Sequence, residues 1–146
     1  MRQLILALSV ACFVTSAVAQ VTAPTPILPG TIKWESFPAI KGLESAWFVG
    51  GPEKKGIYAQ RVKLPSGARI PPHTHPDERF TIVLSGTIYV GFGDVFDERS
   101  VVAVPTGAIY VAPAGVAHYV WAKDGDAVYQ ESGVGPTAPT SSSDSV

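Results

Sequence analysis

The chain has 146 residues, of which 46% are hydrophobic and 16% charged, and its formal net charge is −1. This length suffices for one domain with a sizeable core, and a second domain is not expected. The charge is too nearly balanced to indicate nucleic acid or an anionic membrane surface as a partner.

Residues 1–19 have the pattern of a secretory signal peptide. Arg2 gives a positive start, Leu4–Val14 is an apolar run, and the segment ending at Ala19 fits the small-x-small rule of signal peptidase. The apolar run is too short to anchor the chain across a bilayer. We therefore expect cleavage after Ala19 and a periplasmic or secreted mature protein with no membrane span.

Cys12 is the only cysteine and lies inside the expected signal peptide. The mature chain would then have neither a disulfide nor thiolate chemistry. A lipoprotein signal with Cys12 as the lipidated residue is the alternative. Ser9 argues against it, because a lipobox has leucine at that position.

The remainder of the chain is predicted to be all-β. Residues 20–31 read as an extended lead-in, residues 32–134 as the folded domain, and residues 135–146, rich in Ser, Thr and Pro, as a disordered tail. No helical period persists in the domain, and its β-branched and aromatic runs have the spacing of a sandwich or small barrel. The expected strands are Ala46–Val49, Ile57–Leu64, Phe80–Leu84, Thr87–Phe92, Ile109–Ala112, Ala117–Ala122 and Ala127–Glu131.

All three histidines fall at places suited to a metal site. His73 and His75 are two apart, so on a strand they point to one face with Cβ atoms about 7 Å apart and can converge on one ion. His118 follows a Pro-x-Gly turn on another predicted strand and is a third candidate ligand. Three neutral imidazoles suit Fe, Zn, Cu or Ni, and an added carboxylate would extend the range to Mn.

The glycines around these histidines resemble the two motifs of the cupin family. The segment from Gly67 through His73 and His75 to Gly86 resembles G(X)5HXH(X)3–4E(X)6G, and the segment from Gly107 to His118 resembles G(X)5PXG(X)2H(X)3N. The final Asn of the second motif is replaced here by Ala122. The resemblance implies a single-domain jelly-roll barrel, a double-stranded β-helix, with the histidines lining its interior.

The acidic ligand of the cupin motif has no direct counterpart. Counting back from Gly86, the consensus glutamate position holds Arg79, and Glu78 lies one residue earlier. A bulge or bend at Pro76 would turn Glu78 toward the metal, and on this basis we take His73, His75, Glu78 and His118 as the expected ligands. Two alternatives stay open: a site with three histidines and no carboxylate, and Asp77 as the acid.

Two further residues are predicted to line the interior near the metal. Gln60 alternates with Val62 on its expected strand and would offer a polar group to a substrate. Val120 alternates with His118 and would form an apolar wall of the chamber. A hydrogen-bonded strand glutamine and a packed valine are the plainer interpretations of these two residues.

The sequence thus predicts an exported cupin with one divalent transition metal, Fe, Mn, Ni, Cu or Zn. Open coordination positions on such an ion suit Lewis-acid or O2 chemistry, so we expect a small-molecule enzyme of dioxygenase or isomerase type that acts on an oxygen-rich substrate. A cupin that binds a metal or small ligand without turnover is the alternative. The resemblance is also compatible with a homodimer formed through the region of Trp34, Trp47 and Phe48.

Overall fold

The computed structural model describes residues 25–137 and 140–141. The expected signal peptide, its cleavage site and Cys12 lie outside the described residues. No helix within the described part of the chain is long and apolar enough to cross a membrane.

The described chain consists of strands and one short 3-10 turn, Pro29–Thr31. In chain order the strands are β1 (Glu35–Ser36), β2 (Glu44–Val49), β3 (Gly56–Leu64), β4 (Arg69–Thr74), β5 (Arg79–Ser85), β6 (Thr87–Phe92), β7 (Val102–Pro105), β8 (Ile109–Ala112), β9 (His118–Trp121), β10 (Ala127–Gly135) and β11 (Thr140–Ser141). The predicted all-β class is confirmed. β1, β4, β7 and β11 are additions to the strands expected from the sequence.

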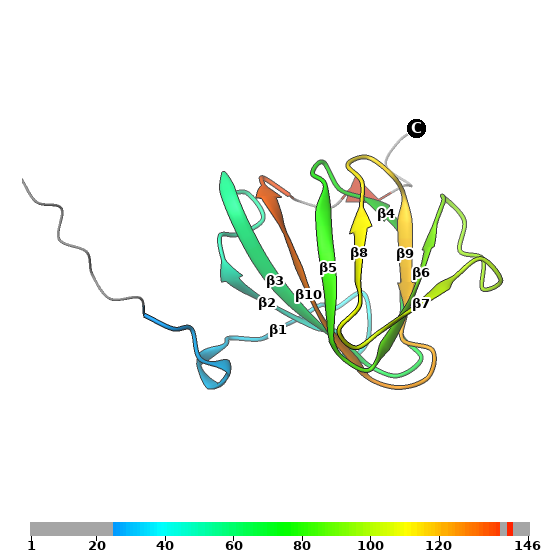
Figure 1. Cartoon of the computed structure of the whole chain (residues 1–146), viewed down its shortest axis with the longest axis horizontal. Coiled ribbons are helices and arrows are strands. Elements are labelled where there is room, and N and C mark those ends of the chain that lie inside the picture. The colour runs from blue at the N-terminus through cyan, green and yellow to red at the C-terminus, as the bar shows by residue number, and fades with distance from the viewer. Residues whose placement is uncertain (1–24, 138–139, 142–146) are drawn as a thin grey trace, which may run out of the picture.

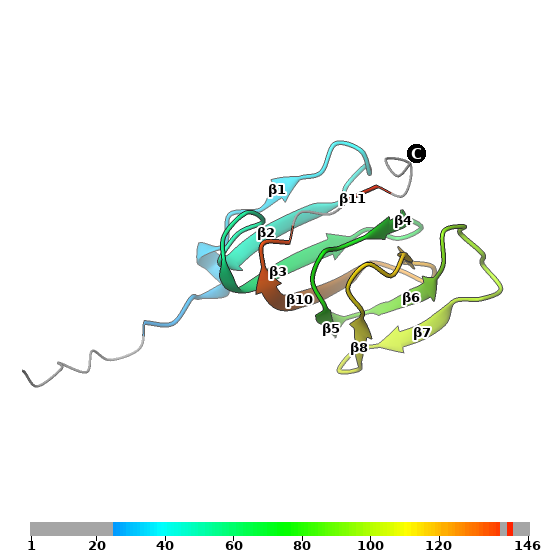
Figure 2. The same ribbon diagram turned by 90° about the horizontal axis from the view of Figure 1, so that it is seen from above.

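Two antiparallel sheets face one another and form the barrel (Figures 1 and 2). One sheet has the strand order β1-β2-β3-β10-β5-β8, and the other has the order β11-β4-β9-β6-β7. Several neighbouring strands, such as β10 and β5 or β4 and β9, are distant in the sequence, as in a jelly roll, because the chain crosses from one sheet to the other. The two faces that meet supply the interior of the barrel.

The hydrophobic core fills one end of this interior. Alternate residues of β3, β5 and β10 point inward there, among them Leu64, Val83 and Tyr129, each 1% exposed. Ile88 and Val120 from the second sheet pack against them and are 0% and 1% exposed. This alternation is the two-residue period of a strand with one buried face.

Gly91 on β6 makes room for the ring of Tyr119, its partner on the neighbouring strand β9 of the same sheet. A Cβ at this position would lie 2.2 Å from Cζ of Tyr119, so any side chain there would overlap the ring. Tyr119 is itself covered by the loop after β6, where Phe96 lies with its ring centroid 4.7 Å away. The loop expected between Gly91 and Ser100 therefore packs as an outer cover of β9.

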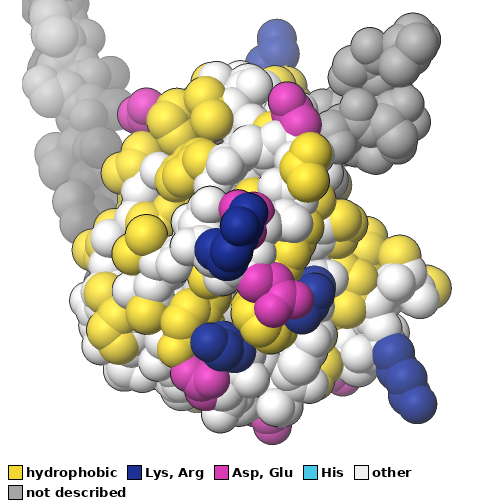
Figure 3. Space-filling model, turned by 90° about the vertical axis from the view of Figure 1, so that its right-hand side faces the viewer, with side chains coloured by type: hydrophobic (Ala, Val, Ile, Leu, Met, Phe, Trp, Pro, Cys, Tyr) yellow, Lys and Arg dark blue, Asp and Glu magenta, His cyan; other side chains and the backbone are white. Residues whose placement is uncertain are grey.

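Figure 3 shows the side of the molecule on which this loop lies. Basic and acidic side chains alternate at the centre of that face, with apolar side chains around them. The ion pairs of this region include Arg69 with Glu98, 2.5 Å apart, and Arg99 with Asp97, 3.1 Å apart. No histidine side chain is seen on this face.

The aromatic residues near the N-terminal end of the domain pack against residues of β3 in the same chain. The ring centroids of Trp47 and Tyr58 are 5.6 Å apart, and the ring of Trp34 lies 3.9 Å from Nζ of Lys63. The first contact joins β2 to β3, and the second places Trp34, which precedes β1, against β3.

The C-terminal boundary differs from the expected one. The disordered tail was expected from residue 135, yet Gly135 is the last residue of β10 and Thr137 is only 2% exposed. Thr140 and Ser141 form β11, which pairs with Thr74 and His73. The Ser/Thr/Pro composition predicts disorder because it carries few apolar groups, but residues 135–137 and 140–141 are held by backbone pairing and by the hydrogen bonds of the buried Thr137 hydroxyl.

Candidate metal centre

His73 and His118 are brought together by the pairing of β4 with β9. The two residues are direct partners in the register of these antiparallel strands, so their side chains leave the same face of the sheet. That face is the interior one, since Val120, two residues after His118, is packed in the core. The five-stranded sheet thus presents two imidazoles side by side to the interior of the barrel.

A β-bulge at two prolines sets the direction of His73. The register shifts by one residue between Ile70 and His73, and Pro71 and Pro72 occupy the interval. Proline has no backbone N–H to give to the ladder, so a bulge is its natural place within a sheet. The extra residue returns His73 to the interior face that Ile70 also occupies.

His75 lies just beyond β4, in the connection to β5. Its backbone carbonyl accepts a hydrogen bond of 2.8 Å from the N–H of Gly115, which belongs to the turn before β9. This bond ties the first histidine motif to the second. His75 is 7% exposed and His118 is 1% exposed, whereas His73 is only partly buried. The cluster therefore meets solvent on the side of His73.

The three imidazoles form one compact group. Their ring centroids are 4.4 Å apart for His73 and His118, 4.8 Å for His73 and His75, and 5.3 Å for His75 and His118. Each can offer one ring nitrogen such that the three nitrogens lie within 4.8 Å of one another. No other group of three or more His, Cys, Asp or Glu side chains in the described residues has this geometry.

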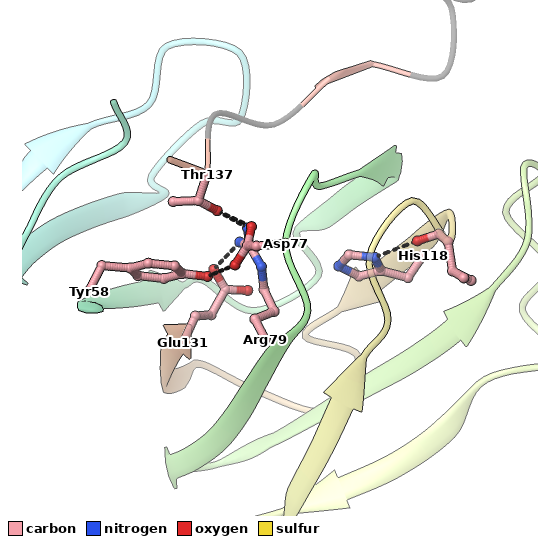
Figure 4. Close-up of polar contacts among 7 residues, drawn as sticks. Tyr58, Asp77, Arg79, His118, Glu131 and Thr137 are labelled. Atoms are coloured by element: carbon pink, nitrogen blue, oxygen red, sulfur yellow. Dashed lines mark hydrogen bonds and ion pairs between the residues drawn. The ribbon is translucent and has the colours of Figure 1, made fainter. Parts of the chain in front are cut away.

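Backbone carbonyls orient two of the rings. Nδ1 of His73 lies 2.8 Å from the carbonyl oxygen of Pro71, and Nδ1 of His118 lies 3.3 Å from that of Val116. A carbonyl only accepts, so Nδ1 carries the proton in both rings, and Nε2 keeps its lone pair. Figure 4 shows the His118 ring held in this way. Second-side hydrogen bonds of this kind are typical of metal-binding histidines.

Three buried ring nitrogens of the cluster have no protein partner. They are Nε2 of His118 and both ring nitrogens of His75, taken among the described residues. A neutral imidazole has one lone-pair nitrogen, so Nε2 of His118 and one nitrogen of His75 are each free to bind a metal ion, and buried polar atoms without partners are otherwise rare in folded proteins. The donor set of the three histidines therefore suits a borderline divalent cation.

The environment keeps these imidazoles neutral. Burial lowers the pKa of His73, that of His118 to about 4, and that of His75 to about 2. The positive charge of Arg79 lowers all three pKa values further. Neutral imidazole is the form that binds metal, so at neutral pH no proton has to be displaced.

Glu78 lies outside this cluster. The chain does bend at Pro76, but Arg79 is 3% exposed and points inward, while Glu78 is exposed. β5 alternates from Arg79 onward, with Thr81 buried and Phe80 exposed, so Glu78 shares the outer face with Phe80. The bulge of this region falls at Pro71 and Pro72 instead of Pro76. The ligand group brought together by the structure has three histidines and no carboxylate.

Arg79 is held by two carboxylates inside the barrel (Figure 4). Its Nη2 donates to Asp77 at 2.8 Å, and its Nη1 donates to Glu131 at 3.3 Å. The side chains of Asp77 and Glu131 are 8% and 10% exposed. Thr137 accepts a hydrogen bond from Arg79 and donates one to Asp77, and Tyr58 donates to Asp77 at 2.7 Å. Asp77, the alternative acidic ligand, is thereby fully engaged with other partners.

Small neighbours on both sides leave room for this network. Arg79 pairs with Gly133 on β10 and Ala112 on β8. A Cβ at Gly133 would lie 2.6 Å from a carboxylate oxygen of Asp77 and 2.8 Å from the hydroxyl of Tyr58. The hydrogen-bond network around Arg79 therefore requires glycine at position 133.

Sequence reasoning did not anticipate the partners of Arg79. The sequence pattern does indicate a buried acid at Glu131, because this residue shares one face of its strand with Ala127 and Tyr129. The consensus position of Arg79 was noted, but its partner Glu131 lies 52 residues away in the sequence. Such a pairing depends on which strands become neighbours.

Gln60 and Val120 both lie on interior faces. Gln60 is partly buried, alternates with the buried Tyr58 and Val62, and pairs with Glu131 on β10. Val120 is 1% exposed and belongs to the core cluster, two residues from His118. Val120 is thus an apolar floor beside the histidines, and Gln60 lies in the opposite wall.

A pocket of about 590 Å³ is lined by none of the three histidines. Exposed apolar side chains of the six-stranded sheet, Ile57, Phe80, Val111 and Val134, line it together with Glu78. Tyr58, Arg79 and Gly133 also line this pocket, so it borders the network around Arg79.

The described strands form a jelly roll of the cupin type. Residues 60–130 match the family model of the cupin domain. It is similar to Germin-like protein 3-1 of Oryza sativa subsp. japonica, with 29% identity over 113 residues, which are 77% of this chain and 47% of that protein. The chain thus spans about half the length of this relative.

Solved structures support the same fold. An RmlC-like cupin from Shewanella frigidimarina is 16% identical, has a TM-score of 0.61, and aligns over 74% of this chain and 87% of its own. The polyketide cyclase RemF from Streptomyces resistomycificus is 16% identical, has a TM-score of 0.64, and aligns over 77% of this chain and 80% of its own. At these identities the likeness concerns the fold alone.

Proposed function

We propose that His73, His75 and His118 bind one divalent transition metal ion, and that the protein acts on a small oxygen-rich molecule at this ion. The observation that carries the proposal is the convergence of three neutral imidazoles, two buried and one partly buried, whose ligand atoms lie within 4.8 Å of one another. Fe, Zn, Ni and Cu suit three nitrogen donors, and we leave Glu78 out of the ligand set.

The residues of the chain have distinct parts in this proposal. The carbonyls of Pro71 and Val116 hold the rings of His73 and His118 with Nε2 facing inward. Val120 excludes water from below, and Gln60 offers an amide to the substrate from the opposite wall. A bound ion would supply open coordination positions at which an oxygen of the substrate is polarised. Reaction types that fit are those of dioxygenases and isomerases.

Metal analysis tests the first half of the proposal. Purified protein is dialysed against Fe, Mn, Ni, Cu or Zn salts, and the bound metal is measured for the wild type, for His118→Ala and for Glu78→Gln. We expect close to one ion per chain in the wild type, almost none in His118→Ala, and wild-type content in Glu78→Gln. A wild type that retains no ion from any of the salts would refute the metal centre.

Turnover is tested on the loaded protein. Oxygen uptake and substrate loss are followed with diols, enols and catechols, with His118→Ala as the blank. Activity that depends on the histidines supports the enzyme. A stoichiometrically loaded protein that is inert across the panel would favour a cupin that binds a ligand without turnover.

We also propose export through the signal-type sequence of residues 1–19. Expression in a bacterial host followed by mass spectrometry of the periplasmic and medium fractions tests this. A mature N-terminus at Gln20 is expected, and an unprocessed chain confined to the cytoplasm would contradict it.

A further inference from the structure

Arg79 occupies the position at which the cupin motif carries its acidic ligand. Its side chain is buried, and Asp77, Glu131 and Thr137 bind its two terminal nitrogens. Nε of Arg79 is also buried and has no hydrogen-bond partner in the part of the chain that the structure describes. Arginine keeps its charge at any ordinary pH, so the barrel interior holds a fixed cation with one donor left to use.

The charge balance of the interior follows from these groups. A divalent ion on three neutral imidazoles adds two positive charges, Arg79 adds one, and Asp77 and Glu131 remove at most two. The loaded site therefore has at least one positive charge in excess. Buried charge without compensation is strongly unfavourable, and a bound anion would compensate it.

Arg79 and the histidines face the same interior. Arg79 lies on β5 of one sheet, and His73 and His118 pair across β4 and β9 of the other. In Figure 4 the His118 ring points toward the strand that carries Arg79. A fixed cation on one wall favours an anion bound between it and the imidazoles of the other wall.

We propose that Arg79 determines the ligand specificity of the metal centre, and that the site selects a small organic anion, a carboxylate or an enolate, over a neutral molecule of the same shape. The anion would contact the ion with one oxygen and accept a charge-assisted hydrogen bond from Nε–H of Arg79. This inference rests on the metal site proposed above and names the chemical class of its ligand.

The test uses protein loaded with Co²⁺, whose visible absorption reports changes at the ion. Acetate and acetamide, which are similar in shape and differ in charge, are titrated into the wild type and into Glu131→Gln. Glu131→Gln keeps Arg79 and removes one negative charge beside it. We expect acetate to bind the variant several-fold more tightly than the wild type and acetamide to bind both alike. Unchanged acetate affinity would overturn the inference.

A second variant separates the guanidinium from the net charge. The double variant Arg79→Gln with Glu131→Gln removes one charge of each sign, so the interior keeps the wild-type balance. We expect acetate binding at least tenfold weaker than in the wild type if Nε–H is the donor. Equal binding would show that the guanidinium does not select the anion.

Failure of the metal site is distinguishable from failure of this inference. Cobalt stoichiometry is measured for every protein before titration, with circular dichroism as the check of folding. A wild type without bound Co²⁺ contradicts the metal centre itself. If the double variant does not fold, the Glu131→Gln titration decides the matter alone.

Discussion

His73 and His118 are direct partners across β4 and β9, and their ring centroids are 4.4 Å apart. The contact joins the two halves of the candidate metal centre, because each ring comes from a different sequence motif. Two strands held in this register need no rearrangement to present both nitrogens to one ion. Metal binding is therefore expected to stabilise the native pairing.

Metal removal should lower the stability of the wild type and leave the stability of His118→Ala unchanged. A ligand that binds only the folded state adds about 2.7 kcal/mol when its free concentration is 100 times its dissociation constant. Thermal unfolding with excess Zn²⁺ and with a chelator measures the effect. Equal midpoints in the two conditions for the wild type would contradict the prediction.

Arg79→Met should destabilise the protein strongly. It leaves the carboxylates of Asp77 and Glu131 buried without their cation, which costs about 3–5 kcal/mol in comparable buried pairs. Arg69→Met is the matched control, since Arg69 pairs with Glu98 at an exposed site and should cost no more than about 1 kcal/mol. Urea unfolding gives both values, and similar losses in the two variants would show that the buried network adds little.

Gly91→Ala should destabilise the barrel by about 1–3 kcal/mol or more. The added methyl group would overlap the ring of Tyr119, which is 1% exposed and cannot move into solvent. Gly30→Ala is the control, because nothing lies within 4 Å of a Cβ there. Chemical denaturation compares the two, and a neutral Gly91→Ala would mean that Tyr119 has another place to go.

The stability difference between the wild type and Glu131→Gln should depend on pH. Burial raises the pKa of Glu131 above 4.5, although Arg79 opposes the shift. The folded state then binds a proton more readily than the unfolded chain, so this group's contribution to stability is complete below pH 4.5 and is lost as pH rises through the folded pKa.

Urea unfolding of both proteins without metal, from pH 4 upward, measures this difference. The histidines titrate in both proteins, so their effect cancels in the comparison. We expect the wild type to lose stability relative to Glu131→Gln as pH rises. A constant difference, or one of the opposite sign, would contradict the raised pKa.

Most of the fold could be predicted because its signals are local. The run Phe80–Leu84 reads as a strand from its β-branched and aromatic residues, and Gly86 marks the turn after it. A Cβ at Gly86 would lie 2.3 Å from the carbonyl oxygen of Asp126, so no other residue fits at this position without a shift of the backbone. β4 was not expected, since its two prolines are poor strand residues until a bulge accommodates them.

The candidate site was predicted only as far as its spacing was informative. The metal-ligand role of His73, His75 and His118 could be predicted because the spacing of the two histidine motifs reflects the pairing of β4 with β9. Whether the Glu78 side chain points inward or outward depends instead on the position of the β-bulge, which adds one residue to the strand. The sequence offered Pro76 for that bulge, whereas the chain uses Pro71 and Pro72. A one-residue change of position exchanges the inner and outer faces of a strand.

The C-terminal strand has a practical consequence for anyone purifying this protein. Ser141 pairs with His73, so β11 runs along the edge of the metal centre. A polyhistidine tag fused shortly after β11 would place competing imidazoles near the site. Metal content and activity are better measured on untagged protein, and any truncation should retain Thr137, whose hydroxyl bridges Asp77 and Arg79.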